Sequence, residues 1–173
     1  KLVGTAGAVI AYEPEKYTYE LLRKQVNDDN TCLYNYAVGD ENKEVEIYFN
    51  KDNDGGHALW NPANHPYNKT SKTQEAVLEK VEMVTLDDKI EKANIITRHV
   101  IKTDTEGCEL MVLKGAERIL REHKPMVICE VNNFALKEMG TSAQELDAYM
   151  TSLGYKAFSL PDEQELDLNT YTA

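Results

Sequence analysis

Short apolar runs alternate with amphipathic stretches along the chain. Residues 8–12 (AVIAY) and 125–131 (PMVICEV) are continuous apolar runs, which are typical of strands buried on both faces of a parallel sheet. Between these runs, apolar residues recur at helical spacing over 15–27 and 109–121, which predicts two amphipathic helices. Strands that alternate with helices in this way indicate an α/β domain with a parallel sheet and right-handed crossovers.

Further elements fill the intervals between these segments. Strands are predicted over 31–38, 44–49, 81–86, 99–104 and 155–160, and helices over 133–139 and 142–153, with a short helix beginning at Leu86. Residues 52–73 contain three turn-forming pairs and almost no periodicity, which predicts a long loop or lid. The polar tail from Pro161 to Ala173 shows no clear pattern.

Composition indicates one domain, residues 1–173, because 42% hydrophobic residues suit a single core. No apolar run approaches the roughly 20 residues that cross a bilayer, and residues 1–7 lack the apolar stretch of a secretory signal. A cytoplasmic location without a membrane span is therefore expected. The 19 basic and 30 acidic residues give a net charge of -11 without a basic stripe, so nucleic acid is not an expected partner.

Neither a zinc site nor a disulfide framework is predicted. The three cysteines are far apart in the sequence and are expected to be buried, reduced thiols: Cys32, Cys108 and Cys129. Oxygen ligands for magnesium are conceivable at Asp87, Asp104 and Glu130, but their spacing carries little weight and no metal site is predicted.

Acidic residues stand at or near the carboxyl ends of four predicted strands: Glu13, Asp40, Asp104 and Glu130. Ligands of open parallel sheets bind beyond this end of the strands, so a site is expected there. Glu13 suits two roles about equally, either accepting hydrogen bonds from ribose hydroxyls or capping the next helix. The segment 101–116 (IKTDTEGCELMVLKGA) favours a site, because a strand-end acid, Glu-Gly and an acid-led amphipathic helix form a specific arrangement.

Six stretches, in order along the chain, resemble the FkbM family of S-adenosylmethionine-dependent methyltransferases. They are 9–14 (VIAYEP), 35–40 (NYAVGD), 84–87 (VTLD), 101–116, 125–130 (PMVICE) and 153–160 (LGYKAFSL). The resemblance covers nearly the whole chain. It implies a Rossmann-like class I methyltransferase sheet, mostly parallel with an antiparallel last strand near one edge and helices on both faces.

The resemblance also implies roles for individual residues. Glu13 would hold the ribose hydroxyls of S-adenosylmethionine, and Asp104 would lie near its methionine end and the acceptor, with Glu106 beside it. The implied adenine contacts are Ala37, Val38 and Asp40. The implied activity is O-methylation of a hydroxyl on a small-molecule or saccharide-type acceptor; the alternative is a non-catalytic binding or assembly domain that retains the fold.

The residue types suit this chemistry. A sulfonium is an activated methyl donor, so the protein must mainly align the acceptor oxygen and exclude water. A carboxylate can remove the proton of an alcohol, and Asp104 is the first candidate for this base, ahead of Glu106. Alternatively, Asp104 bonds loop amides and Glu106 serves the turn with Gly107. Glu109 is interpreted as a helix-start acid. Candidates for the acceptor side, each with a structural alternative, are His57, Trp60 and Glu130.

One part of the family pattern is not found in the sequence. The resemblance implies a strand, an acidic Gly-rich turn and a helix before the first predicted strand. Gly4 and Gly7 are not this turn, because they lie too close to the strand at 8–12 for a helix to intervene. The implied strand would lie between the strands that end at Glu13 and Asp104. The domain is therefore expected to be N-terminally incomplete; the alternatives are a different strand order or completion by another copy in a homo-oligomer. Residues 1–173 alone are expected to transfer methyl groups poorly or not at all.

Overall fold

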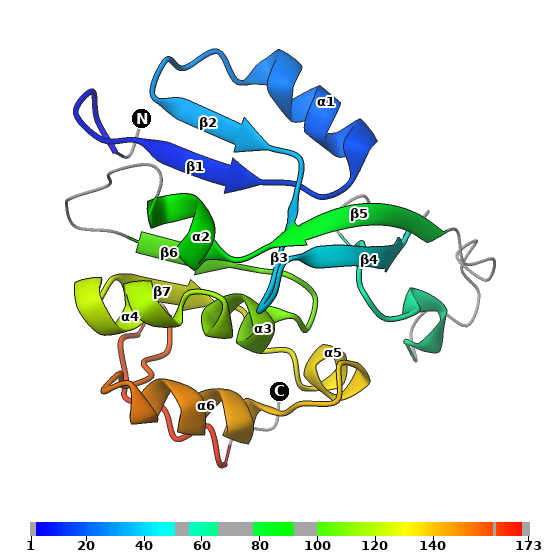
Figure 1. The fold of residues 1–173 in the computed structure, drawn as a ribbon. Helices are drawn as coiled ribbons and strands as arrows, with labels where there is room; N and C mark the ends of the chain where they lie inside the picture. Colours follow the sequence, from blue (N-terminus) through cyan, green and yellow to red (C-terminus); the bar gives the residue numbers. More distant parts are fainter. Residues whose placement is uncertain (1–2, 51–55, 66–77, 92–99, 161, 171–173) are drawn as a thin grey trace.

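The described part of the chain forms three small sheets with helices packed around them (Figure 1). The computed structural model describes residues 3–50, 56–65, 78–91, 100–160 and 162–170. Most of the predicted loop or lid over 52–73 lies outside these residues. The elements, in chain order, are β1 (Val9–Tyr12), α1 (Lys16–Gln25), β2 (Thr31–Tyr34), β3 (Ala37–Val38), β4 (Lys43–Tyr48), the 3-10 helix η1 (Pro62–Asn64), β5 (Leu78–Val84), α2 (Leu86–Glu91), β6 (Val100–Thr103), α3 (Glu109–Lys114), α4 (Glu117–His123), β7 (Met126–Cys129), α5 (Asn133–Glu138) and α6 (Ala143–Ser152).

Two of the three sheets are parallel pairs. β1 pairs with β2, and β6 pairs with β7. The third sheet has the order β3-β5-β4, in which β5 is parallel to β3 and antiparallel to β4. This arrangement confirms a mixed α/β fold with parallel strands. It differs from the expected single sheet, because the described strands form three separate ones.

The predicted strand over 31–38 is divided between two sheets. β2 ends at Tyr34, and Asn35 then donates its Nδ2 protons to the carbonyl oxygens of Glu13 (2.9 Å) and Pro14 (2.8 Å). These bonds tie the end of β2 to the end of β1, and the chain continues into β3, which pairs elsewhere. The division brings the ends of three strands toward one place.

The predicted last strand over 155–160 is wrong as a regular element. Only an isolated antiparallel bridge joins Phe158 to Glu165 in this part of the chain. The antiparallel strand of the described fold is instead β4, which lies beside β5.

The predicted helix over 109–121 is two helices, α3 and α4, which are separated at Gly115 and Ala116. A Cβ at Gly115 would overlap the carbonyl oxygen of Gly39, so the backbones meet here at a distance that only glycine allows. α4 begins at the next turn, where Asp87 accepts hydrogen bonds from its first amides.

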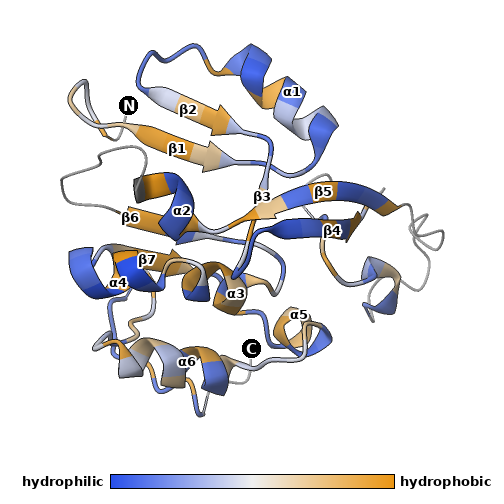
Figure 2. Cartoon of the chain, viewed as in Figure 1, coloured by the Kyte–Doolittle hydropathy of each residue, from blue (hydrophilic) through white to orange (hydrophobic). Residues whose placement is uncertain are grey.

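The main core lies between the β6–β7 pair and the helices α3, α4 and α6. Its fully buried members include Leu113, Ile119, Leu120 and Leu136, and Ile101 and Val127 pack against it from the strands. Figure 2 shows mostly apolar residues in β1, β6 and β7, whereas polar and apolar residues alternate in β4 and β5. Burial of each leucine or isoleucine contributes about 1.5–3 kcal/mol, which fixes α3 against the carboxyl end of β6.

Three strands are less buried than their apolar sequences predict. The first residues of β1, β6 and β7, namely Val9, Val100 and Met126, are 36%, 60% and 66% exposed. Cys32 in β2 is exposed and Cys129 in β7 is half-buried, so of the three cysteines predicted to be buried only Cys108 is. Complete burial of a strand needs a covering layer on both faces, and these strands are only partly covered.

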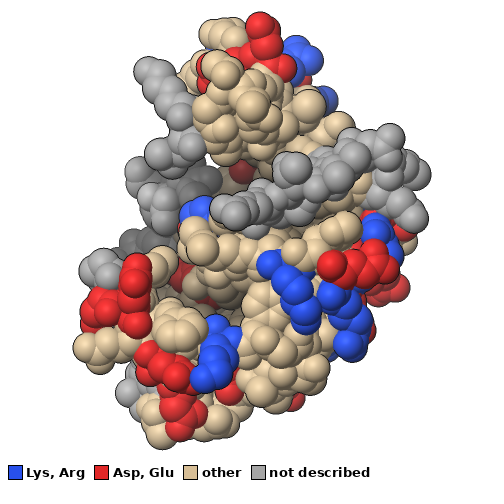
Figure 3. All heavy atoms as spheres, turned by 90° about the vertical axis from the view of Figure 1, so that its left-hand side faces the viewer, with Lys and Arg blue, Asp and Glu red and all other residues tan. Residues whose placement is uncertain are grey.

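Charged side chains of both signs are interspersed on the face shown in Figure 3. Exposed ion pairs such as Arg121–Glu117 (2.8 Å) contribute about 0–1 kcal/mol each. Within the described ranges, no helix combines the length and apolar character that a transmembrane span requires.

Candidate active site

A pocket of about 180 Å³ lies beyond the carboxyl ends of β1 and β6 and beside β3. Six residues that the sequence predicted for the site line it: Glu13, Ala37, Val38, His57, Asp104 and Glu106. The other lining residues are Tyr12, Pro14, Tyr36, Ile47, Ala58, Leu59, Met83, Thr105 and Cys108. Two of the four strand ends that the sequence marked with acids, those at Glu13 and Asp104, therefore meet at one pocket.

Glu13 is free of the capping role that the sequence left open, because Glu15 performs it. Glu15 is 3% exposed, and its carboxylate accepts hydrogen bonds from the amides of Tyr17 (2.7 Å) and Thr18 (2.5 Å) at the start of α1. Burial acts to raise the pKa of Glu15, but the bonds from Tyr17 and Thr18 outweigh it and lower that pKa. Glu13 accepts one hydrogen bond, from the amide of Glu15 to Oε1 (2.9 Å).

Glu13 lies in a half-buried position at the pocket wall. Burial raises the pKa of Glu13. The hydrogen bond from the Glu15 amide acts to lower this pKa, and the negative charge of Glu15 acts to raise it further. A desolvated carboxylate is a stronger hydrogen-bond partner than one in water. Glu13 is thus suited to bind a ligand that offers hydroxyl donors.

A row of tyrosines borders the pocket beside Glu13. The rings of Tyr12 and Tyr34 stack with centroids 5.6 Å apart, and those of Tyr34 and Tyr36 stack at 6.4 Å. Lys89 Nζ lies 4.2 Å from the centroid of the Tyr36 ring. Burial, followed by the charges of neighbouring groups, raises the pKa of Tyr12 to about 12, so its hydroxyl remains protonated at neutral pH.

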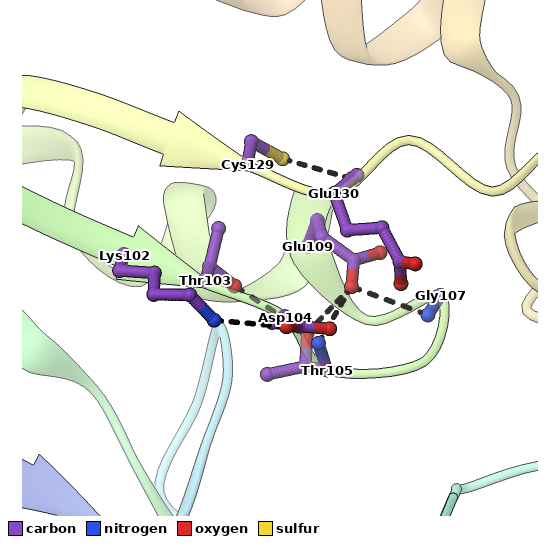
Figure 4. Close-up of polar contacts among 8 residues, drawn as sticks. All are labelled: Lys102, Thr103, Asp104, Thr105, Gly107, Glu109, Cys129 and Glu130. Carbon is purple, nitrogen blue, oxygen red and sulfur yellow. Dashed lines mark hydrogen bonds and ion pairs between the residues drawn. The ribbon is translucent and has the colours of Figure 1, made fainter. Parts of the chain in front are cut away.

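Acids that follow β6 and β7 lie close together, and Figure 4 shows three of the acids in this region, Asp104, Glu109 and Glu130. Asp104 is exposed and pairs with Lys102 Nζ at 2.8 Å. Glu106 is half-buried, and its pKa is raised first by burial and then by the charges of Glu130, Asp104 and Glu109. Burial, and next the charge of Asp104, likewise raises the pKa of Glu130. The acids therefore sense one another electrostatically.

Three predicted residues lie outside the pocket lining. Asp40 is exposed, although its charge reaches Cys108 in the pocket wall. Glu130 lies beside Asp104 among the acids. Trp60 is 9% exposed, and its Nε1 donates a 2.7 Å hydrogen bond to the carbonyl oxygen of Glu106.

His57 lines the pocket from the segment before Trp60. Its Nδ1 accepts a hydrogen bond from the amide of Asn50 (3.1 Å), and its ring lies edge-on to Phe49 at 5.0 Å. Asn50 and Phe49 therefore hold the ring in place, and Nε2 is the ring nitrogen that does not take part in the bond to Asn50.

Sequence reasoning missed the part that Glu109 plays. Glu109 is 1% exposed, and its Oε1 accepts hydrogen bonds from Thr105 and Gly107 in the loop that carries Glu106. The position of Glu109, two residues after the Glu106-Gly107 turn, was a sequence signal for this contact. The same position is equally typical of an acid at the start of a helix. Burial raises the pKa of Cys108 and of Cys129 to about 12, with Glu109 as the next cause for both thiols.

A second cavity, of about 320 Å³, lies beyond Gly107 between α3 and the turn from α5 to α6. None of the predicted site residues lines it. Among the described residues, no group of three or more His, Cys, Asp or Glu side chains is arranged to hold a metal ion. Both carboxylate oxygens of Asp87 accept hydrogen bonds from amides of α4, so this acid has a structural role.

Parallel strands whose carboxyl ends surround one acid-lined pocket define an α/β protein with a ligand site at the strand ends. A sequence model of the methyltransferase FkbM domain matches residues 1–157, and the chain belongs to this family. The resemblance seen in the six sequence stretches is thereby confirmed, and methyl transfer is the general activity that the family implies.

A comparison with solved structures also found a similar protein. The crystal structure of methyltransferase FkbM from Methylobacillus flagellatus KT is similar, with a TM-score of 0.47 and 20% sequence identity over 84% of this chain. The match covers 30% of that protein, so this chain spans about 30% of its length. No curated protein matches the chain significantly.

Proposed function

We propose that the domain transfers a methyl group from S-adenosylmethionine to a hydroxyl of a small-molecule or saccharide-type acceptor. The observation that carries the proposal is the convergence of Glu13, Ala37 and Val38 with Asp104 and Glu106 around one pocket. The first three residues suit a nucleoside, and the two acids suit a sulfonium and an alcohol.

The residues present fit this cofactor. Glu13 Oε1 is engaged with the Glu15 amide, and Oε2 is the oxygen left for a ribose hydroxyl. Ala37, Val38 and Met83 supply an apolar wall for a flat ring. When bound, the cofactor supplies a methyl group on a positively charged sulfur, for which nearby carboxylates are a favourable environment.

The geometry favours Glu106 over Asp104 as the base that accepts the acceptor's proton. Asp104 is exposed, and its carboxylate is held in an ion pair with Lys102 Nζ at 2.8 Å. Glu106 is half-buried among like charges, which raises its pKa and makes it a better proton acceptor. In this proposal Asp104 helps to orient the acceptor hydroxyl, and Glu130 and His57 border the acceptor.

The proposal includes a further strand between β1 and β6. Among the described strands, each of these two pairs along one edge only, β1 with β2 and β6 with β7. Unpaired edge groups are templates for another strand. A backbone placed there would lie between Glu13 and Asp104, close to where the methionine end of the cofactor must pass. A domain of this fold with no strand at that place is expected to bind the nucleoside but to transfer methyl groups poorly.

Calorimetry with nucleosides tests the proposal on the chain as it stands. S-adenosylhomocysteine and adenosine are expected to bind saturably, and Glu13→Gln is expected to weaken both about tenfold or more, because one charge-assisted hydrogen bond contributes about 1.5–3 kcal/mol. The variant should not weaken 2′,3′-dideoxyadenosine, which lacks the hydroxyls. Glu20→Gln is the matched control, because Glu20 is a carboxylate of α1 that pairs with Arg23 and lies outside the pocket lining.

Two outcomes would count against the proposal in different ways. No saturable binding of either nucleoside by the wild-type chain would refute the cofactor site. Equal loss of adenosine and dideoxyadenosine binding in Glu13→Gln would refute the ribose contact. Binding with no methyl transfer, even with the further strand supplied, would favour a non-catalytic binding domain that retains the fold.

A further inference from the structure

The loop that carries Glu106 has a backbone that needs external support. Glu106 and Gly107 have φ angles of 52° and 97°, so two consecutive residues lie in the left-handed region. A non-glycine residue persists there only when its surroundings hold it in place. β6 ends at Thr103, so the sheet ladder does not extend to this loop.

Glu109 supplies that support from the first residue of α3. Its Oε1 accepts hydrogen bonds from the Thr105 amide (2.7 Å), the Thr105 hydroxyl (3.1 Å) and the Gly107 amide (3.3 Å), as Figure 4 shows. One oxygen therefore receives donors from both sides of Glu106. The helix behind it is anchored in the core by Leu110 and Leu113, so the acceptor has a fixed position.

Trp60 holds the same loop from the other direction. Its Nε1 donates to the carbonyl oxygen of Glu106 at 2.7 Å. The indole is itself fixed, because it is 9% exposed and packs edge-on against Phe134 with centroids 5.6 Å apart. Gly107 packs so closely on the carbonyl group of Ala135 that a Cβ would overlap it. The loop is thus held at its amides, at its carbonyl group and by close packing.

These contacts oppose an electrostatic tendency. The carboxylates of Asp104, Glu109 and Glu130 all repel that of Glu106. A freely mobile loop would relax by moving Glu106 into solvent, away from the other acids. The clamp removes that freedom while leaving the Glu106 side chain in the pocket lining.

We propose that Glu109 is a positioning residue which, together with Trp60, clamps the Thr105–Gly107 turn and so holds the Glu106 carboxylate at the pocket. The catalytic consequence rests on the function proposed above, whereas the clamp itself does not. Glu109 touches no ligand in this proposal. It acts through the backbone on either side of Glu106.

The chain contains a single tryptophan, so Trp60 reports directly on the clamp. In 15N-labelled protein, Glu109→Ala is expected to shift the indole N–H resonance upfield and to increase acrylamide quenching of the indole fluorescence, because the hydrogen bond to Glu106 loosens. Glu109→Gln retains an oxygen acceptor for Thr105 and Gly107, and it should leave both signals near those of the wild type. Glu117→Ala removes the acid at the same position of α4 and is the matched control.

A folded Glu109→Ala variant with unchanged indole signals would overturn the clamp. Should that variant fail to fold, Trp60→Phe tests the same idea by native-state hydrogen exchange. The amides of Thr105 and Gly107 are expected to exchange about tenfold faster or more in Trp60→Phe than in the wild type, since opening of the turn then costs less. Unchanged exchange of both amides would equally overturn the proposal.

Activity gives a readout that a merely structural residue would not move. Where methyl transfer is measurable, Glu109→Ala should lower kcat about tenfold or more and leave adenosine affinity within about twofold, because Glu13 does not touch the clamp. Glu109→Gln should recover most of kcat. Equal losses of kcat and adenosine affinity in Glu109→Ala would indicate general destabilisation and contradict a positioning role. Failure of nucleoside binding in the wild type would speak against the proposed function and leave the spectroscopic test intact.

Discussion

Asp87 lies at the start of α2, but its side chain caps a different helix. Its Oδ2 accepts a hydrogen bond from the amide of Arg118 (2.8 Å), and its Oδ1 accepts one from the amide of Ile119 (3.1 Å). The residue at the N-cap position of α4, Ala116, has no side chain that could do this. Replacement of Asp87 by alanine would therefore leave two first-turn amides of α4 without an acceptor.

The size of the effect follows from these two bonds. Loss of a helix N-cap costs about 0.5–2 kcal/mol, and Asp87 caps two partly buried amides rather than one. We expect the free energy of unfolding to fall by about 2 kcal/mol, at the upper end of that range. For a domain of this size, that loss lowers Tm by about 4–8 °C. Asp87→Asn keeps one oxygen acceptor and should lose about half as much.

Thermal unfolding followed by far-ultraviolet circular dichroism measures this difference. Asp88→Ala is the control, because Asp88 is the next residue of the same helix, is exposed, and accepts a hydrogen bond from exposed Asn42. The control should stay within about 0.5 kcal/mol of the wild type. Equal Tm values for Asp87→Ala and Asp88→Ala would refute the assignment of Asp87 as the cap of α4.

Gly115→Ala should destabilise the fold more than a surface substitution does, because the added Cβ overlaps the carbonyl oxygen of Gly39. A chemical denaturation midpoint equal to that of the wild type would contradict the close approach of the Gly115 and Gly39 backbones. Glu106→Gln should stabilise the chain at neutral pH. Burial, and then the charges of its acidic neighbours, raise the pKa of Glu106 in the folded state above the ordinary 4.5. The stability that protonated Glu106 contributes is therefore complete below pH 4.5 and is lost as the pH rises through the raised pKa. Its advantage over the wild type, measured by denaturation at two pH values, should therefore vanish in acid, and a constant difference would exclude this cause. Cys32 should react with a thiol reagent in the native state and Cys108, buried with a pKa of about 12, only on unfolding; labelling at equal rates would contradict the burial of Cys108.

Elements whose cause is local were predictable from the sequence. The apolar run at 8–12 is β1, and the helical spacing that follows it is α1, with Glu15 at its N-cap. The acid at the end of each strand also follows from local order, because a parallel strand delivers its next residue to the carboxyl edge. This is why Glu13 and Asp104 could be assigned to one pocket before the fold was known.

Features that depend on contacts distant in sequence were not predictable in the same way. The helical pattern over 109–121 is continuous, and only the approach of Gly39 and the cap from Asp87 divide it into two helices. The apolar sequence of β7 predicts full burial, but exposure of Met126 depends on which layers cover the sheet. Glu109 likewise has an ordinary helix-start position, and its role depends on how the preceding loop folds back.

The two halves of the site are supported by different parts of the chain, and this separates their functions. Glu13 is positioned by its neighbours Glu15 and Asn35, which fix the ends of β1 and β2. Glu106 is positioned by Glu109 and Trp60, which act on the loop after β6. Substitutions in the second group should therefore alter the proposed proton removal while leaving the proposed nucleoside contact of the first group intact. Burial of Glu13 depends on its place at a strand end, whereas burial of Glu106 depends on a backbone held by contacts distant in sequence. The positions of the acids along the sequence could therefore locate the pocket, but they could not show which acid is the better base.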